Sequence, residues 1–370
     1  MQKPLALALL SAAGFVSPAL AQDPAAAAPD PAKVTVNGFA SAAFTYDDNR
    51  PSSDELNLRV FDFESDKVKL DVAELVVQRT TPSPGDFGFR VDLTAGQSIP
   101  KLTAANGLFR DDDGEAEDFD LQQAFVTWVA PVGTGLKIDA GKWVTLAGAE
   151  LIEGYDGFND HYSRSILFGY AIPFTHTGAK VSYNFGKVAV TAMGMQGWDN
   201  FEDNNGAKTF GGQLALTPSS QFSAYATFLT GAEQTDNDDD KRKLVDLIGV
   251  WKPASSVALT VNYDWAKEDF AGLGGGEAQW SGIAASLKVT LSPSFAVAVR
   301  GERFDDEDGV RTGTPQVVKE FTLTPEFRFG KHVVLRGDLR RDSSDEFVFD
   351  SEDGLQDSRT TFAVNLIALF

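Results

Sequence analysis

The chain has 370 residues, a formal net charge of −21 and no cysteine. Its acidity argues against nucleic acid as a partner, and without cysteine no disulfide framework holds the fold. After residue 21 no stretch has the roughly 20 consecutive apolar residues of a membrane-spanning helix, which excludes helical membrane proteins.

The first 21 residues predict a secretory signal peptide. A basic start at Lys3 precedes an apolar run from Leu5 to Val16, and Ala19-Leu20-Ala21 supplies a small-residue cleavage site. The apolar run is too short for a membrane anchor. We therefore expect the mature chain to begin at Gln22, with residues 22–32 as a flexible periplasmic lead and residues 33–370 as one domain.

That domain consists of segments with a two-residue hydrophobic period, which predicts β-strands that are apolar on one face only. In SVALTVNYDW (256–265), for example, Val257 and Leu259 share one face and Thr260 and Asn262 the other. The predicted strands are 33–46, 67–80, 86–95, 118–130, 136–145, 177–185, 187–197, 208–217, 221–231, 243–252, 256–266, 278–291, 294–304, 316–328, 332–341 and 359–370.

The connections between these strands alternate between short turns and long, acidic loops. The seven short turns are 81–85, 131–135, 185–187, 217–220, 252–256, 291–294 and 329–331, and the eight long loops are 47–66, 96–117, 146–176, 198–207, 232–242, 267–277, 305–315 and 342–357. An even number of strands with this alternation is typical of outer-membrane barrels. The predicted fold class is all-β: a transmembrane antiparallel up-and-down β-barrel of about 16 strands, with short periplasmic turns and long extracellular loops.

A soluble β-sandwich or β-solenoid would also show a two-residue period, so the aromatic residues are a second criterion. Aromatic side chains recur near predicted strand ends, where a membrane barrel has girdles at its two lipid–water interfaces. They are Trp128, Trp143, Trp198, Trp251, Trp265, Trp280, Phe329 and Phe370. Together with the alternating connections, they favour the membrane barrel.

The last ten residues, TFAVNLIALF, predict the strand that closes the barrel against the first strand at 33–46. A barrel has no free edge, so its terminal strands must pair. Alternate apolar residues lead to the terminal aromatic residue: Phe362, Val364, Leu366 and Phe370. This pattern resembles the signal by which the outer-membrane assembly machinery recognises its clients.

The stretch HYSRSILFGYAIPFTHTGAKVSYNF (161–185), followed by MQGWDNFEDNN (195–205), resembles the OmpL-like β-barrel porin-2 family of Gram-negative outer-membrane porins. The residues that carry the resemblance are Ser163-Arg164-Ser165, Pro173, His176-Thr177-Gly178 and Gly197-Trp198-Asp199-Asn200, after AGKWVTLAGAE (140–150). It extends over nearly all of the mature chain. The resemblance implies a pore but names no solute.

Charged residues occupy the polar faces of the predicted strands and are expected to line a pore wall. They are Arg90, Lys180, Lys288, Arg300, Arg336 and Arg340, with Asp92, Asp139, Glu302, Glu326 and Asp338. A charge that faces lipid costs up to about 2–4 kcal/mol at the bilayer midplane, so these positions require a wet lumen. A barrel of this size leaves an aqueous channel, which predicts passive diffusion of small hydrophilic solutes and ions.

The third long loop, 146–176, is too apolar for an exposed surface loop, and we expect it to fold into the lumen. Its carboxylates Glu150, Glu153, Asp156 and Asp160 would then face basic wall residues, with Arg164 as an anchor. Opposed charges across a constriction create a transverse field that filters solutes. The alternative is that the loop packs outside the barrel, against a neighbouring subunit.

Acidic runs at 111–118, 236–240 and 304–309 lack the complete ligand spacing of a calcium loop, so we predict no metal site there. We interpret them as a solvated acidic mouth that divalent ions bridge to lipopolysaccharide phosphates. Such a mouth predicts a weak preference for cations, which inward-facing arginines would oppose at the narrowest point.

Other functions remain open on the sequence. The alternatives are a substrate-selective porin for sugars or anions and a non-conducting structural or adhesive barrel. An enzymatic barrel needs a nucleophile beside a histidine, but His161, His176 and His332 show no such motif, so no enzyme and no cofactor are predicted. The expected partners are outer-membrane lipid, lipopolysaccharide, the assembly machinery, small solutes and, by analogy with other sixteen-stranded porins, two further copies in a homotrimer.

Overall fold

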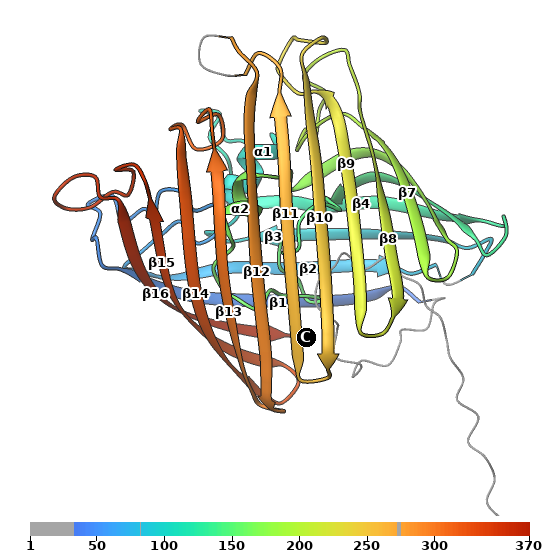
Figure 1. The fold of residues 1–370 in the computed structure, drawn as a ribbon. Coiled ribbons are helices and arrows are strands. Elements are labelled where there is room, and N and C mark those ends of the chain that lie inside the picture. Colours follow the sequence, from blue (N-terminus) through green and yellow to red (C-terminus); the bar gives the residue numbers. More distant parts are fainter. Residues whose placement is uncertain (1–32, 82, 272–274) are drawn as a thin grey trace, which may run out of the picture.

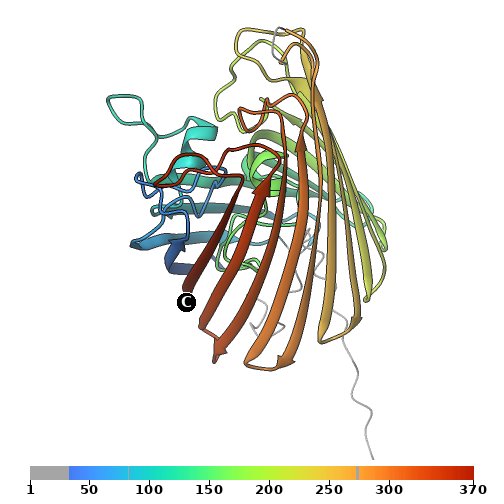
Figure 2. The same cartoon turned by 60° about the vertical axis from the view of Figure 1, so that its left-hand side comes forward.

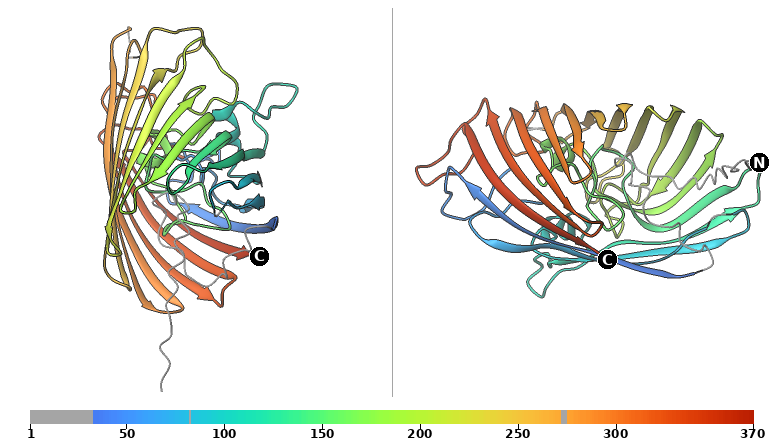
Figure 3. Two further views of the ribbon diagram at one scale, coloured as in Figure 1. Left: turned by 90° about the vertical axis from the view of Figure 1, so that its right-hand side faces the viewer. Right: turned by 90° about the horizontal axis from the view of Figure 1, so that it is seen from below.

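The computed structural model describes residues 33–370 apart from 82 and 272–274. Within these residues, sixteen strands pair antiparallel in chain order and close into a barrel, with the first strand beside the last (Figures 1 and 3). The predicted fold class is confirmed. The predicted signal peptide and the lead at 22–32 lie outside the described residues.

Two short helices accompany the strands of the barrel. The first eight strands are β1 (Thr35–Asp47), β2 (Val68–Arg79), β3 (Phe87–Ala95), β4 (Phe119–Ala130), β5 (Leu136–Val144), β6 (Thr175–Asn184), β7 (Val188–Met195) and β8 (Thr209–Ser219). The second eight are β9 (Phe222–Ala232), β10 (Lys241–Ala254), β11 (Val257–Glu268), β12 (Ala278–Ser292), β13 (Phe295–Asp306), β14 (Gln316–Phe329), β15 (Val333–Ser344) and β16 (Ser358–Leu369). Helix α1 (Pro100–Asn106) follows β3, and helix α2 (Ile166–Tyr170) lies between β5 and β6. In the described part of the chain, no helix has the length and apolarity to cross a membrane.

Each predicted strand overlaps an observed one, and the boundaries differ by a few residues. One difference affects the third loop, because β6 begins at Thr175 and places His176 in the wall rather than in the loop. His176 is buried and hydrogen-bonds Thr145 Oγ1 at 3.1 Å and the carbonyl of Gly197 at 3.2 Å. These two hydrogen bonds satisfy the imidazole of His176 within the strand. Its polarity was therefore not a sign of a loop.

Short turns and long loops gather at opposite ends of the barrel (Figure 2). The strands are joined at one end by the turns 80–86, 131–135, 185–187, 220–221, 255–256, 293–294 and 330–332. At the other end lie the loops 48–67, 96–118, 145–174, 196–208, 233–240, 269–277, 307–315 and 345–357. We refer to 48–67 as the first loop and to 145–174 as the third loop.

The apolar rows of the strands face outward. In β16, the exposed side chains of Phe362, Val364 and Leu366 alternate with the buried side chains of Ala363 and Asn365. The same alternation leaves large exposed apolar side chains on most other strands. Because successive residues of a strand point to opposite faces, the polar rows line the interior.

The aromatic girdle follows the sequence prediction only in part. Trp128, Trp251, Phe329 and Phe370 are exposed beside the short turns, as a lipid-interface girdle requires. The prediction is wrong for Trp143, Trp198 and Trp280, which are buried. Loops that fold inward supply these rings with partners: the indole N–H of Trp280, for example, donates to the carbonyl of Ala171 in the third loop at 3.1 Å.

The C-terminal residue takes part in closing the barrel. The N–H of Gly38 donates to the carbonyl of Phe370 at 3.1 Å, and the N–H of Phe370 donates to the carbonyl of Gly38 at 3.0 Å. A Cβ atom at residue 38 would overlap the phenyl ring of Phe370. Glycine therefore lets the terminal ring lie directly on the first strand.

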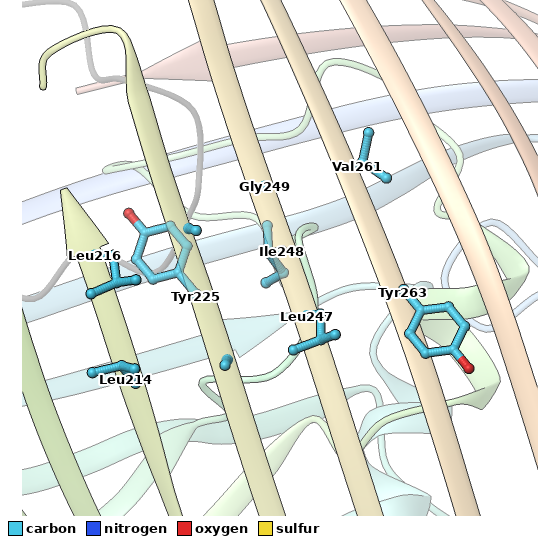
Figure 4. A pocket seen from close by; sticks show the side chains of 10 residues that line it. Leu214, Leu216, Tyr225, Leu247, Ile248, Gly249, Val261 and Tyr263 are labelled. Carbon is cyan, nitrogen blue, oxygen red and sulfur yellow. The ribbon is translucent and has the colours of Figure 1, made fainter. Parts of the chain in front are cut away.

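A shallow apolar groove of about 400 Å³ runs over β8–β11 (Figure 4). Its exposed side chains, Leu214, Leu216, Leu247 and Tyr263, belong to the outward rows of these strands and surround Gly249. This groove is part of the lipid-facing surface and is separate from the lumen.

Candidate functional site

The third loop crosses the lumen and contacts inward side chains on opposite sides of the barrel. The carbonyl of Leu146 accepts from Gln213 on β8 at 2.8 Å. The N–H of Tyr155 donates to Glu74 on β2, also at 2.8 Å. The loop therefore lies inside the ring of strands, as Figures 1 and 3 show, and does not pack outside the barrel.

Local sequence explains why the end of this loop is helical. Ser165 is the N-cap of α2, and its hydroxyl accepts from the N–H of Phe168 at 3.0 Å. The next two N–H groups, of Ile166 and Leu167, donate to Glu302 of β13 at 2.7 and 3.0 Å. A carboxylate is favourable at a helix N-terminus because the unpaired N–H groups carry partial positive charge. Glu302 thus fixes the helix against the wall.

The helix brings apolar side chains into the long-loop half of the barrel interior. Phe168 packs against Phe61 of the first loop, with ring centroids 5.8 Å apart, and against Phe174 at the same spacing. Leu167 and Ile172 belong to the same buried cluster. Burial of this apolar surface, at about 25 cal/mol per Å², holds the loop in place.

The four acidic residues of the loop each contact a basic residue of the wall. The distances are 2.6 Å for Glu150–Arg300, 2.8 Å for Glu153–Arg336, 2.5 Å for Asp156–Arg90 and 2.8 Å for Asp160–Lys288. The predicted transverse field requires opposed charges across open water. Here the opposed charges are in contact, so these pairs fasten the loop to the wall.

The contacts of Arg164 differ from the anchoring role that the sequence predicted. Its guanidinium donates to the carbonyl of Tyr162 at 2.8 Å, lies 4.6 Å from the ring centre of Phe61 and is 3.8 Å from Glu153. Its contact with the wall is made by its carbonyl, which accepts from Arg340 at 2.5 Å. The side chain braces the loops, and the backbone provides the wall contact.

The other predicted wall residues also project into the lumen and form close networks. Asp92 accepts from Arg90 at 2.8 Å and from Gln123 at 2.5 Å. Asp338 accepts from the N–H of Ser163 at 2.8 Å. Further ion pairs of these residues include Lys180–Asp139 at 3.6 Å, Lys288–Glu326 at 3.2 Å and Arg340–Asp342 at 2.8 Å.

A second group of lumen charges was missed by sequence reasoning. Arg59 of the first loop is buried and pairs with Asp62 of the same loop and, at 2.7 Å, with Asp342 of β15. Arg359 of β16 donates to the carbonyl of Asn57 at 2.8 Å. The apolar run LNLRVFDF (56–63) was the available signal that the first loop folds inward. Like the third loop, it is too apolar for an exposed surface loop.

Glu153 is the most enclosed of the loop carboxylates. Burial alone would raise its pKa, but Arg336 and Arg164 more than offset that effect, so the pKa of Glu153 lies below its usual value. Glu153 is therefore ionised at neutral pH and forms a buried ion pair with Arg336.

His161 is the histidine with the most polar surroundings, and sequence reasoning missed its partners. Its Nε2 lies 3.1 Å from Ser286 Oγ, and its Nδ1 lies 2.7 Å from Thr324 Oγ1. Burial, reinforced by Arg300 and other wall cations, holds the pKa of His161 well below its usual value, so the ring is neutral. A catalytic triad would place a carboxylate where Thr324 lies. The adjoining cavity, of about 40 Å³, has room for a water molecule or two.

A closed sixteen-stranded barrel with an apolar outer face, a charged interior and an inward-folded long loop is the architecture of porins. Residues 33–370 match the family described as "Putative beta-barrel porin-2, OmpL-like", and the chain belongs to that family of outer-membrane porins. Members of such families are typically channels without enzymatic activity. No curated protein matches the chain.

Solved porins share the fold at low sequence identity. An anion-selective porin from Comamonas acidovorans is 13% identical, with a TM-score of 0.61 and coverage of 91% of this chain and 99% of that one. OmpF of Salmonella typhi, in complex with daunomycin, is 10% identical, with a TM-score of 0.62 and coverage of 91% and 98%. The trimer form of OmpT from Vibrio cholerae is 10% identical, with a TM-score of 0.59 and coverage of 91% and 99%.

Proposed function

We propose that this protein is a porin of the outer membrane, exported by its signal peptide, through which small hydrophilic solutes and ions diffuse passively. The observation that carries the proposal is the row of charged side chains inside a closed sixteen-stranded barrel. Some of these charges, such as Lys137 and Arg328, keep part of their surface in contact with water. Buried charges are found in pairs, but charges that keep part of their surface exposed are stabilised by water, so they favour a wet interior at these positions.

A planar bilayer measurement tests the proposal. We expect purified protein to produce discrete current steps in KCl, because a barrel of this size is too wide to be filled by its own wall side chains. Protein unfolded by heat in the same detergent is the control and should give no steps. A folded protein without conductance would instead be a structural or adhesive barrel.

The third loop is proposed as the constriction of this channel. Glu150, Glu153, Asp156 and Asp160 hold it against the wall, and Arg164 braces it against the first loop. The pore-wall role extends to the charged residues on the inward rows of the strands. A homotrimer is proposed by analogy with the OmpT trimer form.

The terminal strand is proposed as the signal for the assembly machinery, with Phe362, Val364, Leu366 and Phe370 as its outward row. Phe370→Ala is expected to lower the yield of folded barrel in cells several-fold. The folded fraction is measured by the faster migration of unheated barrel in SDS gels. Phe329→Ala, which removes another exposed phenyl ring beside a short turn, is the matched control and should lower the folded yield much less. Equal yields of the two variants would refute a special role for the terminal ring.

A further inference from the structure

The ion pairs along part of the lumen wall are asymmetric: the basic partner touches water and the acidic partner is buried. The side chain of Lys137 is 30% exposed, whereas that of its partner Asp139 is 1% exposed. For Arg328 and its partner Glu326 the values are 33% and 3%. Arg90, Lys180 and Lys288 are likewise more exposed than the wall carboxylates that they pair with.

These five basic residues lie at one end of the lumen. Lys137 is the second residue of β5, directly after a short turn, and Arg328 is the second-last residue of β14, directly before one. Arg90, Lys180 and Lys288 lie within a few residues of the short turns of β3, β6 and β12. We call this set, Arg90, Lys137, Lys180, Lys288 and Arg328, the basic vestibule. It lies in the short-turn half of the lumen, and two of its members, Arg90 and Lys288, bind the third loop.

Two loop carboxylates oppose this trend. Asp156 is 34% exposed and Glu150 is 16% exposed. Each is bound directly by an arginine, Arg90 and Arg300, at 2.5 and 2.6 Å. In the Arg90–Asp156 pair the acidic partner is the more exposed, so the excess of exposed positive charge in the vestibule comes from Lys137, Lys180, Lys288 and Arg328.

The orientation of an ion pair matters to a permeating ion because Coulomb energy falls inversely with distance. An ion that passes the vestibule approaches the ammonium or guanidinium group more closely than the buried carboxylate behind it. The acidic loops lie at the opposite end of the barrel, and salt screens exposed charges beyond about 8–10 Å at physiological ionic strength. Basic side chains that line a pore favour anions.

We propose that the channel prefers small anions over cations, although the chain as a whole carries a net charge of −21. This inference rests on the proposed porin function and names its solute class. The vestibule sets the preference, and the acidic mouth reduces it at low salt. Since each exposed base has a carboxylate behind it, the preference is modest, with a chloride-to-potassium permeability ratio of roughly two or more.

The reversal potential under a tenfold KCl gradient tests the inference on the full-length protein. The wild type is expected to show the sign of anion preference. The double variant Lys137→Gln and Arg328→Gln removes the two most exposed bases and should lower the permeability ratio by about twofold. Asp139 and Glu326 keep Lys180 and Lys288 as partners in this variant, so the fold is retained. Lys331→Gln, in the short turn 330–332, removes a positive charge outside the lumen and should leave the ratio unchanged.

The outcomes separate this inference from the function on which it rests. A conducting wild type with cation preference would overturn the anion inference and leave the porin function standing. An unchanged ratio in the double variant, or an equal drop in Lys331→Gln, would also overturn it, because the vestibule would then not set the sign. Absence of any current from folded protein would overturn both.

Discussion

Deletion of residues 154–163 from the third loop is expected to raise single-channel conductance at least about twofold, because a segment that crosses the lumen is removed from the path of the ions. The deleted residues include Asp156 and Asp160, which tie the loop to Arg90 and Lys288. After the deletion these basic side chains face water and keep Asp92 and Glu326 as partners on the wall. Conductance is measured on reconstituted single channels in KCl.

A matched deletion makes this experiment specific. Residues 351–354 form the tip of the loop between β15 and β16, where an isolated bridge joins Phe349 to Gln356. Their removal shortens a long loop without touching the lumen and should leave the conductance near the wild-type value. If the third-loop deletion also conducts like the wild type, that loop is not the constriction.

Glu153→Ala is expected to lower the free energy of unfolding by about 3–5 kcal/mol, because removal of one partner of a buried ion pair leaves the other charge uncompensated. Arg336 has no solvent exposure and would keep only neutral hydrogen-bond partners, the carbonyls of Asn159 and His161 and the side chain of Asn365. The midpoint of urea unfolding in lipid vesicles measures the loss.

The double variant Glu153→Ala and Arg336→Met is the control, since it removes both charges and should recover part of the lost stability. The pH dependence has a defined sign. The pKa of Glu153 is lowered in the folded state, so its stabilisation is complete above the usual glutamate value of about 4.3 and is lost as the pH falls through the folded value. A double variant as unstable as Glu153→Ala would show that packing, and not the buried charge, accounts for the loss.

The architecture was readable from the sequence because it depends on local patterns. The two-residue period identified each strand, and the alternation of short turns with long loops indicated their number and the two ends of the barrel. The side-chain direction in a strand is set by its period, so the inward rows, including Arg300 and Arg336, followed directly. The apolar composition of the third loop predicted that it would fold inward.

Only the tertiary structure decided how the interior is filled. Trp143 and Trp280 have the sequence context of girdle residues, yet they face inward because the loops provide apolar partners there. The first loop packs against the third loop inside the barrel through Phe61 and Phe168. It is tied to the wall by contacts of Arg59 and Asn57 with Asp342 and Arg359, which lie hundreds of positions later in the chain. In the Lys137–Asp139 pair the basic partner touches water and the acidic partner is buried. This difference depends on how separate segments pack together, so no local pattern in a single sequence records it.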